Sequence, residues 1–333
     1  MGRRPVPPIA WLLTAGTGVA LVAITIPLLH AHGTAWFFRE GDAYLYRATA
    51  LDPFGTGKSF AAVGRTVEIP YRYGRIGLPF ASWLLSAGRP GLVPWWLIVI
   101  HLAAIAAIPG LAAALIDSYG APALGGAVAL ASPGLLLIHD YVYAEPLLIA
   151  LVLFGFNLEG RNRPRAALGV LAYAVLVKEI AALALIPLVW RALRRRDPWS
   201  AAAGASALVP YAAWSVWLRF RVGEFPFHNH TVSEAFGWPG VGVHQALAQG
   251  TPDHVVVVSM VFATIVLCAV GAYVARQVPI GGLSAMLAIV TVCLGLNALV
   301  FESETMRLLT VPQVFALLCL VMALAPKTRE AKV

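Results

Sequence analysis

The chain has 333 residues, of which 59% are hydrophobic and only 12% are charged. Soluble domains carry about 25% charged residues, so the composition excludes an ordinary soluble enzyme and predicts an integral membrane protein. The net charge of +8 does not indicate nucleic-acid binding, because the basic residues are concentrated in loops between apolar segments. We expect the whole chain, residues 1–333, to form a single membrane domain with no separate soluble domain.

Apolar segments close to the length of a membrane helix, about 20 residues, recur along the chain. The first, residues 9–29, is too long for the apolar core of a signal peptide, about 7–15 residues, and is interpreted as an uncleaved span. The predicted fold is all-α, a multi-pass helical protein with one additional helix on the membrane surface. The ten predicted spans are residues 9–29, 91–116, 121–138, 141–158, 165–178, 180–193, 198–218, 254–275, 279–300 and 308–325.

The charges between these spans predict an orientation, because basic residues in short loops favour the cytoplasm. With the N-terminus inside, the inner face holds 13 basic and four acidic residues, and the outer face holds 11 basic and 12 acidic residues. The clusters RNRPR at 161–165 and RALRRRD at 191–197 both fall inside. The sequence therefore predicts a plasma-membrane protein with both termini cytoplasmic, and its Ala-, Gly-, Pro- and Arg-rich composition indicates a bacterium.

Two long outer connections are predicted, at residues 30–90 and 219–253. In the first, the apolar part of RYGRIGLPFASWLL (residues 72–85) is too short to span a membrane and is interpreted as an interfacial helix. Residues 166–190 form either one helix or two short spans that meet at Lys178 and Glu179. The hairpin is favoured, because a charge at the bilayer centre costs about 2.5–3.5 kcal/mol and because it keeps both arginine clusters on one side.

In this topology, ionisable and tyrosine side chains from separate segments share the outer side of the membrane. Ionisable groups at membrane depth are expensive and tend to mark a functional site, although ion pairs between helix ends would also explain them. The candidates are Glu40, Asp42, Arg72, Arg75, Asp140, Tyr143, Glu145, Lys178, Glu179, Glu302, Glu304 and Arg307.

The sequence predicts no resident metal or cofactor. Cys268, Cys293 and Cys319 lie in apolar spans, where a cysteine is most often a small hydrophobic residue. A divalent cation is an open alternative, for which the acids on the outer side would be the ligands.

Five short motifs, taken in order and on one side of the membrane, resemble the GT-C superfamily of membrane glycosyltransferases. The resemblance is to the dolichyl-phosphate-mannose and aminoarabinose transferase types and their small bacterial relatives. It covers most of the chain, although each motif alone is weak. The motifs are GDAYLY with Asp42, RYGRIGLPFASWLL, SPGLLLIHDYVYAEPLLIALVLF, LVKEIAALALIPLVW and ESETMRLL.

The resemblance implies that a sugar passes, with inversion, from a polyprenyl-phosphate donor to an acceptor hydroxyl at the extracytoplasmic face. The acceptor would be a cell-envelope glycan, lipid or protein, and membrane lipids would surround the enzyme. By its position in the family pattern, Asp42 would be the general base. Phosphate anions are usually clamped by Arg and Lys, so Lys178, Arg75, Arg307 and Arg72 would bind the donor phosphate. The remaining candidates, Glu40, Asp140, Tyr143, Glu145, Glu179, Glu302 and Glu304, would bind substrate or support these groups.

Two other classes of protein remain open. A transporter or lipid flippase would carry out no chemistry, and it would favour broken helices, internal repeats and polar groups near the midplane. The sequence has no visible repeat, and its charged turns favour one face of the membrane. A membrane scaffold that assists another enzyme would have no activity alone and would tolerate substitution of Asp42.

Overall fold

The computed structural model describes residues 5–39, 41–56, 71, 73–223, 225–226, 237–249, 252–294, 299 and 302–324. Every element in this part of the chain is a helix, which confirms the predicted all-α fold. Five helices are long and apolar enough to cross a membrane, and a bent pair of helices would make a sixth span. The five are Pro8–His32, Val93–Ser118, Pro198–Arg221, Asp253–Val274 and Thr305–Ala323.

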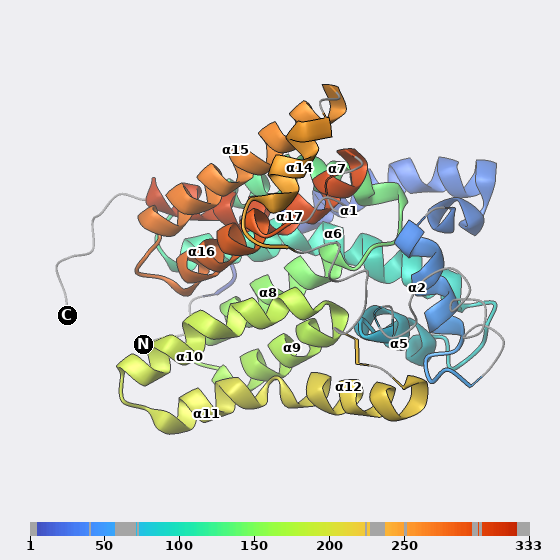
Figure 1. Ribbon diagram of the computed structural model, residues 1–333, viewed down its shortest axis with the longest axis horizontal. Helices are drawn as coiled ribbons and strands as arrows, with labels where there is room; N and C mark the ends of the chain where they lie inside the picture. The colour runs from blue at the N-terminus through green and yellow to red at the C-terminus, as the bar shows by residue number, and fades with distance from the viewer. Residues whose placement is uncertain are drawn as a thin grey trace.

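The helix α6 (Val93–Ser118) lies at the centre of the bundle. It packs against α1 (Pro8–His32), α8 (Glu145–Gly160) and η2 (Ala123–Ala131). Most of its length is buried by these neighbours, which is why an apolar segment with no clear polar face is stable here. Figure 1 shows the longer helices running side by side, roughly along the long axis of the molecule.

The predicted span at 121–138 is a broken helix. The segment consists of η2, then α7 (Pro133–Leu137) and η3 (Ile138–Asp140), and it bends by 68° between Ala131 and Pro133. Ser132 is extended, with φ −67° and ψ 119°, because the residue before a proline is driven out of the helical region. After the bend, Asp140 at the end of this segment pairs with Arg39 at 2.8 Å.

The chain folds back at Lys178, as the hairpin interpretation predicts. The helix α9 (Pro164–Val177) ends there, and Lys178 is fully extended, with φ −159° and ψ 129°. It is followed by η4 (Glu179–Ala184) and α10 (Leu185–Arg194). Arg191, near the end of α10, forms a 2.9 Å ion pair with Glu159, near the end of α8. Since only three residues separate the end of α8 from the start of α9, α10 must return to the end of the bundle where α9 starts.

The C-terminal half adds two further groups of helices. The helices α11 (Pro198–Ser206) and α12 (Val209–Val222) follow α10, and α12 packs against α9. The helix α15 (Pro252–Val274) packs against α14 (Val241–Gln249), α16 (Pro279–Val292) and α17 (Glu302–Ala323).

The predicted turn ESETMR is the start of a helix. The helix α17 begins at Glu302 and continues to Ala323, so Arg307 lies on a regular helix and not in a loop. Acidic residues are favourable in the first turn of a helix, because they interact with its positive end. The acidic residues of this motif are therefore as typical of the start of a helix as they are of a polar turn.

The connection at residues 30–90, which was predicted to lie outside, is more helical than predicted. It contains η1 (Thr34–Phe38), α2 (Gly41–Leu51) and α5 (Gly77–Leu85), and α5 is the apolar part of the predicted interfacial helix. This helix ends where Ala87 and Gly88 adopt left-handed φ angles of 51° and 70°. The helices α2 and α5 pack against each other and against α6 at the right-hand end of Figure 1.

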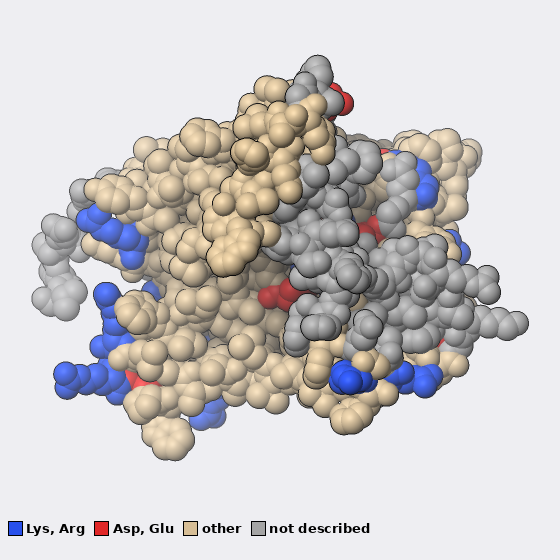
Figure 2. Space-filling model, viewed as in Figure 1, with Lys and Arg blue, Asp and Glu red and all other residues tan. Residues whose placement is uncertain are grey.

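Lys and Arg side chains are visible at both ends of the molecule. Figure 2 shows one group at the left-hand end, where Figure 1 places the turn between α10 and α11, and others at the right-hand end. Apart from a few acidic side chains, the described surface between them is uncharged in this view. This distribution agrees with a protein that sits in a bilayer with its long axis across it.

Candidate functional site

The first half of the candidate site joins two segments that lie far apart in the sequence. Arg307, in the first turns of α17, donates from Nη1 to the Oδ2 of Asp42, near the start of α2, at 2.6 Å. Both residues are buried, at 7% and 6% exposure. A charge this far from water is stable only when it is paired, so the ion pair fixes α2 against α17.

The second half joins the start of α8 to the end of α9. Lys178 donates from Nζ to the Oε1 of Glu145 at 2.7 Å, and Glu145 is only 1% exposed. The Nε of Arg307 lies 3.8 Å from the same oxygen, which is too long for a hydrogen bond but close enough for attraction. The four side chains therefore form a continuous chain from Asp42 through Arg307 and Glu145 to Lys178.

One atom at the centre of this chain is not hydrogen-bonded. The Oε2 of Glu145 is buried and has no hydrogen-bond partner in the part of the protein that the structure describes. A buried acceptor without a donor costs about 1–3 kcal/mol. Such an atom suits a ligand that brings its own donor, for example a hydroxyl group.

A third ion pair lies beside the first two. Arg75 donates from Nε and Nη2 to the two carboxylate oxygens of Glu179, at 3.1 and 2.7 Å. Arg75 also donates to the hydroxyl of Tyr71, whose ring lies under the guanidinium. Burial opposes ionisation of Glu179, but the bidentate Arg75 outweighs it and lowers the pKa of Glu179 to about 2. The pair is therefore fully ionised at neutral pH.

Two tyrosines complete the cluster. Tyr143 lies beneath Arg307, with its ring centroid 4.7 Å from the guanidinium carbon. Tyr46 is buried among the charges of Arg75, Asp42, Glu145 and Arg307, and burial raises the pKa of its phenol well above the usual value. Tyr46 is therefore a neutral hydroxyl at the centre of the cluster. We refer to the eight side chains Asp42, Tyr46, Arg75, Tyr143, Glu145, Lys178, Glu179 and Arg307 as the charged cluster.

Of the eight residues of the charged cluster, sequence reasoning named all except Tyr46. Tyr46 stands four residues after Asp42, and this spacing places both on one face of α2 once that helix is recognised. Asp140 does not join the cluster, because its carboxylate accepts from Arg39 at 2.8 Å. Arg39 was not predicted as a site residue. The predicted Glu40 and Arg72 lie outside the described residues, as do the side chains of Glu302 and Glu304.

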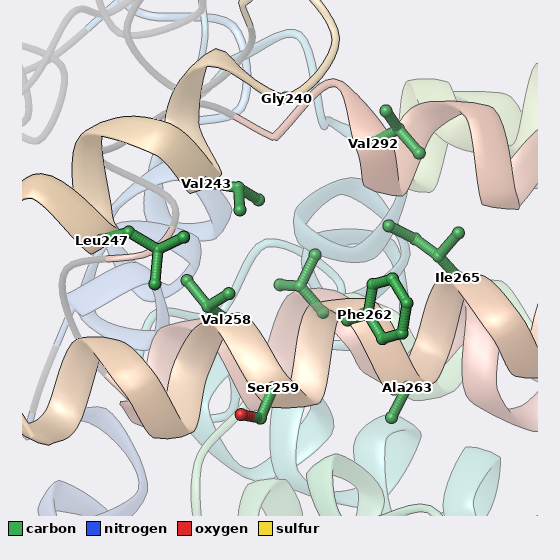
Figure 3. Close-up of a pocket in the computed structure, with 10 residues that line it drawn as sticks. Gly240, Val243, Leu247, Val258, Ser259, Phe262, Ala263, Ile265 and Val292 are labelled. Carbon is green, nitrogen blue, oxygen red and sulfur yellow. The ribbon is translucent and has the colours of Figure 1, made fainter.

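A separate groove lies between α14, α15 and the end of α16, with a volume of about 560 Å³. In Figure 3, Val243 and Leu247 on α14 face Val258 on α15. None of the residues that line it is charged: Gly240, Val243, Leu247, Val258, Ser259, Val261, Phe262, Ala263, Ile265 and Val292. Without a cation or a base, the groove offers nothing for chemistry on a phosphate, so the charged cluster is the candidate active site.

No family model, no curated protein and no solved structure matches the chain. Within the described residues, no group of three His, Cys, Asp or Glu side chains is placed to hold a metal ion. The charged cluster provides cations that attract an anion, carboxylates that accept a proton and hydroxyls that orient a polar ligand. These are the parts that a group transfer from a phosphate requires.

Proposed function

We propose that this protein is a membrane glycosyltransferase that uses a polyprenyl-phosphate sugar as its donor. The observation that carries the proposal is the buried chain Asp42–Arg307–Glu145–Lys178, in which four helices each contribute one charged residue. Burying this many charges is costly. A structural role alone would require fewer of them, and apolar side chains of similar volume would serve it at least as well.

In the proposed transfer reaction, each charged side chain has a role. The acceptor oxygen attacks the anomeric carbon, the bond from that carbon to the phosphate oxygen breaks, and the lipid phosphate leaves with the bonding electrons. Asp42 takes the proton of the acceptor hydroxyl, while Lys178, Arg307 and Arg75 stabilise the leaving phosphate. Attack opposite the leaving group inverts the anomeric carbon. The carboxylate oxygen Oε2 of Glu145 accepts a hydrogen bond from a substrate hydroxyl.

The charge balance of the cluster supports this assignment. Three cations, Arg75, Lys178 and Arg307, face three carboxylates, those of Asp42, Glu145 and Glu179. During transfer, the donor phosphate gains one negative charge while Asp42 loses one by protonation. The net charge of the buried site therefore stays constant through the step, which avoids the large penalty for creating charge in a medium of low dielectric constant.

Donor binding is also linked to release of the base. Arg307 pairs with Asp42 at 2.6 Å, and a phosphate that enters the cluster competes for the same guanidinium. Arginine binds phosphate through two parallel hydrogen bonds, at least as strongly as it binds a carboxylate. Arrival of the donor would thus free the Asp42 carboxylate for the acceptor.

The test compares Asp42→Asn with a matched control. The purified protein is supplied with polyprenyl-phosphate sugars and a membrane-lipid extract as acceptor, and released polyprenyl phosphate is measured. Loss of a general base lowers the rate by about 10²–10⁴-fold, so Asp42→Asn should be nearly inactive. Asp52→Asn is the control, because Asp52 is also buried but binds Thr56 outside the cluster. Undiminished transfer by Asp42→Asn, or no release of polyprenyl phosphate by the unaltered protein, would refute the proposal.

A second candidate function is transport of a polar lipid or small anion. It is favoured by the helix breaks at Ser132 and Lys178, because transporters bind substrates at interrupted helices. A flippase would move a fluorescent polyprenyl-phosphate lipid across proteoliposomes without cleaving it. Movement of intact lipid at the same rate in the Asp42→Asn variant would favour this second function.

A further inference from the structure

A further arginine, Arg39, lies outside the charged cluster and is held between two aromatic rings. Its guanidinium carbon lies 3.6 Å from the ring centroid of Trp36 and 3.9 Å from that of Tyr141. The guanidinium also donates to the carboxylate of Asp140 at 2.8 Å and to the carbonyl of Trp36 at 2.6 Å. A planar cation fits between two rings in this way, whereas the ammonium group of lysine would not stack.

The stack around Arg39 continues into the charged cluster. Tyr141 stacks on Tyr143, with ring centroids 5.9 Å apart, and Tyr143 lies beneath Arg307. On the other side of Arg39, Trp36 stacks on His32 at 4.4 Å. Side chains in face-to-face contact therefore run without a break from the end of α1 to Arg307.

The backbone that carries Tyr141 and Tyr143 lies between two helices and belongs to neither. Residues 141–144 follow η3 and precede α8, and Tyr141 is extended, with φ −127° and ψ 137°. The segment is fixed from outside, because Val142 donates to the carbonyl of Phe37 at 3.2 Å and His101 contacts the carbonyl of Ile138 at 2.9 Å. Arg39 adds side-chain contacts to Asp140 and to the ring of Tyr141.

We infer that Arg39 is a positioning residue, which holds Tyr141 and Tyr143 so that Arg307 is aimed correctly at the donor phosphate. The inference rests on the proposed transferase function. The printed ring and ion-pair contacts of Arg39 are with Trp36, Tyr141 and Asp140, so its connection to Arg307 runs through the rings of Tyr141 and Tyr143. Its ion pair with Asp140 is partly exposed, with side chains at 24% and 17%, and pairs of this kind contribute little to stability. The main effect of Arg39 is therefore on geometry.

The test is a double-mutant cycle on the transferase reaction. Arg39→Lys keeps the positive charge but loses the planar stack, and Tyr143→Leu removes the ring that connects the stack to Arg307. Misplacement of a catalytic group can reduce a rate by up to about 100-fold, so each single variant should lower kcat by about tenfold with little change in KM. The double variant should be no slower than the slower single variant, because both substitutions disrupt the same connection.

One control sets the scale. Arg47→Lys should change kcat by less than about twofold, because within the described residues Arg47 lies near a single ring, that of Phe38, at 5.6 Å. Losses that multiply in the double variant, or an unchanged kcat in Arg39→Lys, would overturn the inference.

Hydrogen–deuterium exchange provides a readout that does not depend on activity. In Arg39→Lys, peptides covering residues 138–143 should exchange faster, while peptides from α15 should be unchanged. Unchanged exchange at 138–143 would overturn the inference even if the protein proves inactive as a transferase. If only the proposed function is wrong, the unaltered protein will show no transfer, but Arg39→Lys will still exchange faster at residues 138–143.

Discussion

At the scale of single residues, the site is held together by charges whose removal has unequal consequences. Glu145 is the shared partner, since Lys178 donates to it at 2.7 Å and Arg307 lies 3.8 Å from it. Removing one member of a buried pair leaves the other as an uncompensated charge, whereas removing both can be nearly neutral. Stability and function should therefore respond differently to single and double substitutions.

We predict that Glu145→Leu destabilises the protein by about 3–5 kcal/mol, because it leaves the ammonium group of Lys178 buried without its carboxylate. The double variant Glu145→Leu with Lys178→Met should recover most of this loss but no transferase activity. Unfolding in detergent, followed by circular dichroism, measures both effects. A double variant as unstable as the single would show that the pair is not the main source of the loss.

At the scale of helices, close backbone contacts determine where the charged residues end up. Gly77, the first residue of α5, packs directly on α9. A Cβ atom added at Gly77 would lie 2.6 Å from the backbone nitrogen of Val177, the residue before Lys178. Because backbone cannot move aside as a flexible side chain can, the position of Lys178 depends on the absence of a side chain at residue 77.

We predict that Gly77→Ala pushes α5 away from α9, lowers the unfolding midpoint in detergent and lowers transfer by shifting Lys178. Gly169→Ala is the matched control, since it lies on the exposed face of α9 with nothing within 4 Å of an added Cβ. That substitution should cause no loss, because alanine is a better helix former than glycine. Equal effects of the two substitutions would contradict the packing argument.

The sequence predicted helices more reliably than it predicted contacts. Apolar length located most long helices to within a few residues, because the bilayer imposes that length. It missed α2, where GDAYLYRATAL mixes polar and apolar residues and was interpreted as part of a loop. It also could not predict which carboxylate pairs with which cation. The Asp42–Arg307 pair joins residues 265 positions apart, and Asp140 pairs with Arg39, which was not among the predicted site residues.

At the scale of the whole molecule, the charges fall at two opposite ends of the bundle. Asp42, Glu145 and Arg307 lie at the starts of α2, α8 and α17, and Lys178 lies at the end of α9, so their ion pairs mark one end. The Arg191–Glu159 pair and the RNRPR turn mark the other end, where α8 and α10 finish. The five to six apolar spans between these ends fit a membrane protein, and the proposed orientation places the charged cluster outside.

We predict that cysteines introduced at the two ends react with a membrane-impermeant maleimide from opposite sides of intact cells. Gly91→Cys, in the exposed turn before α6, should be labelled from outside, and Arg195→Cys, in the turn after α10, only after the membrane is opened. The unaltered protein is the control for background, which would come from the half-buried Cys293, since Cys268 and Cys319 are buried. Labelling of both positions from the same side would contradict the arrangement.

The break at Lys178 also has a consequence for how the protein is made. With 14 residues, α9 is about 21 Å long, shorter than the ~30 Å hydrocarbon core. A nascent chain therefore gains little by inserting α9 alone, and the flanking arginine clusters resist crossing. Residues 164–194 should therefore enter the bilayer together as one unit during synthesis.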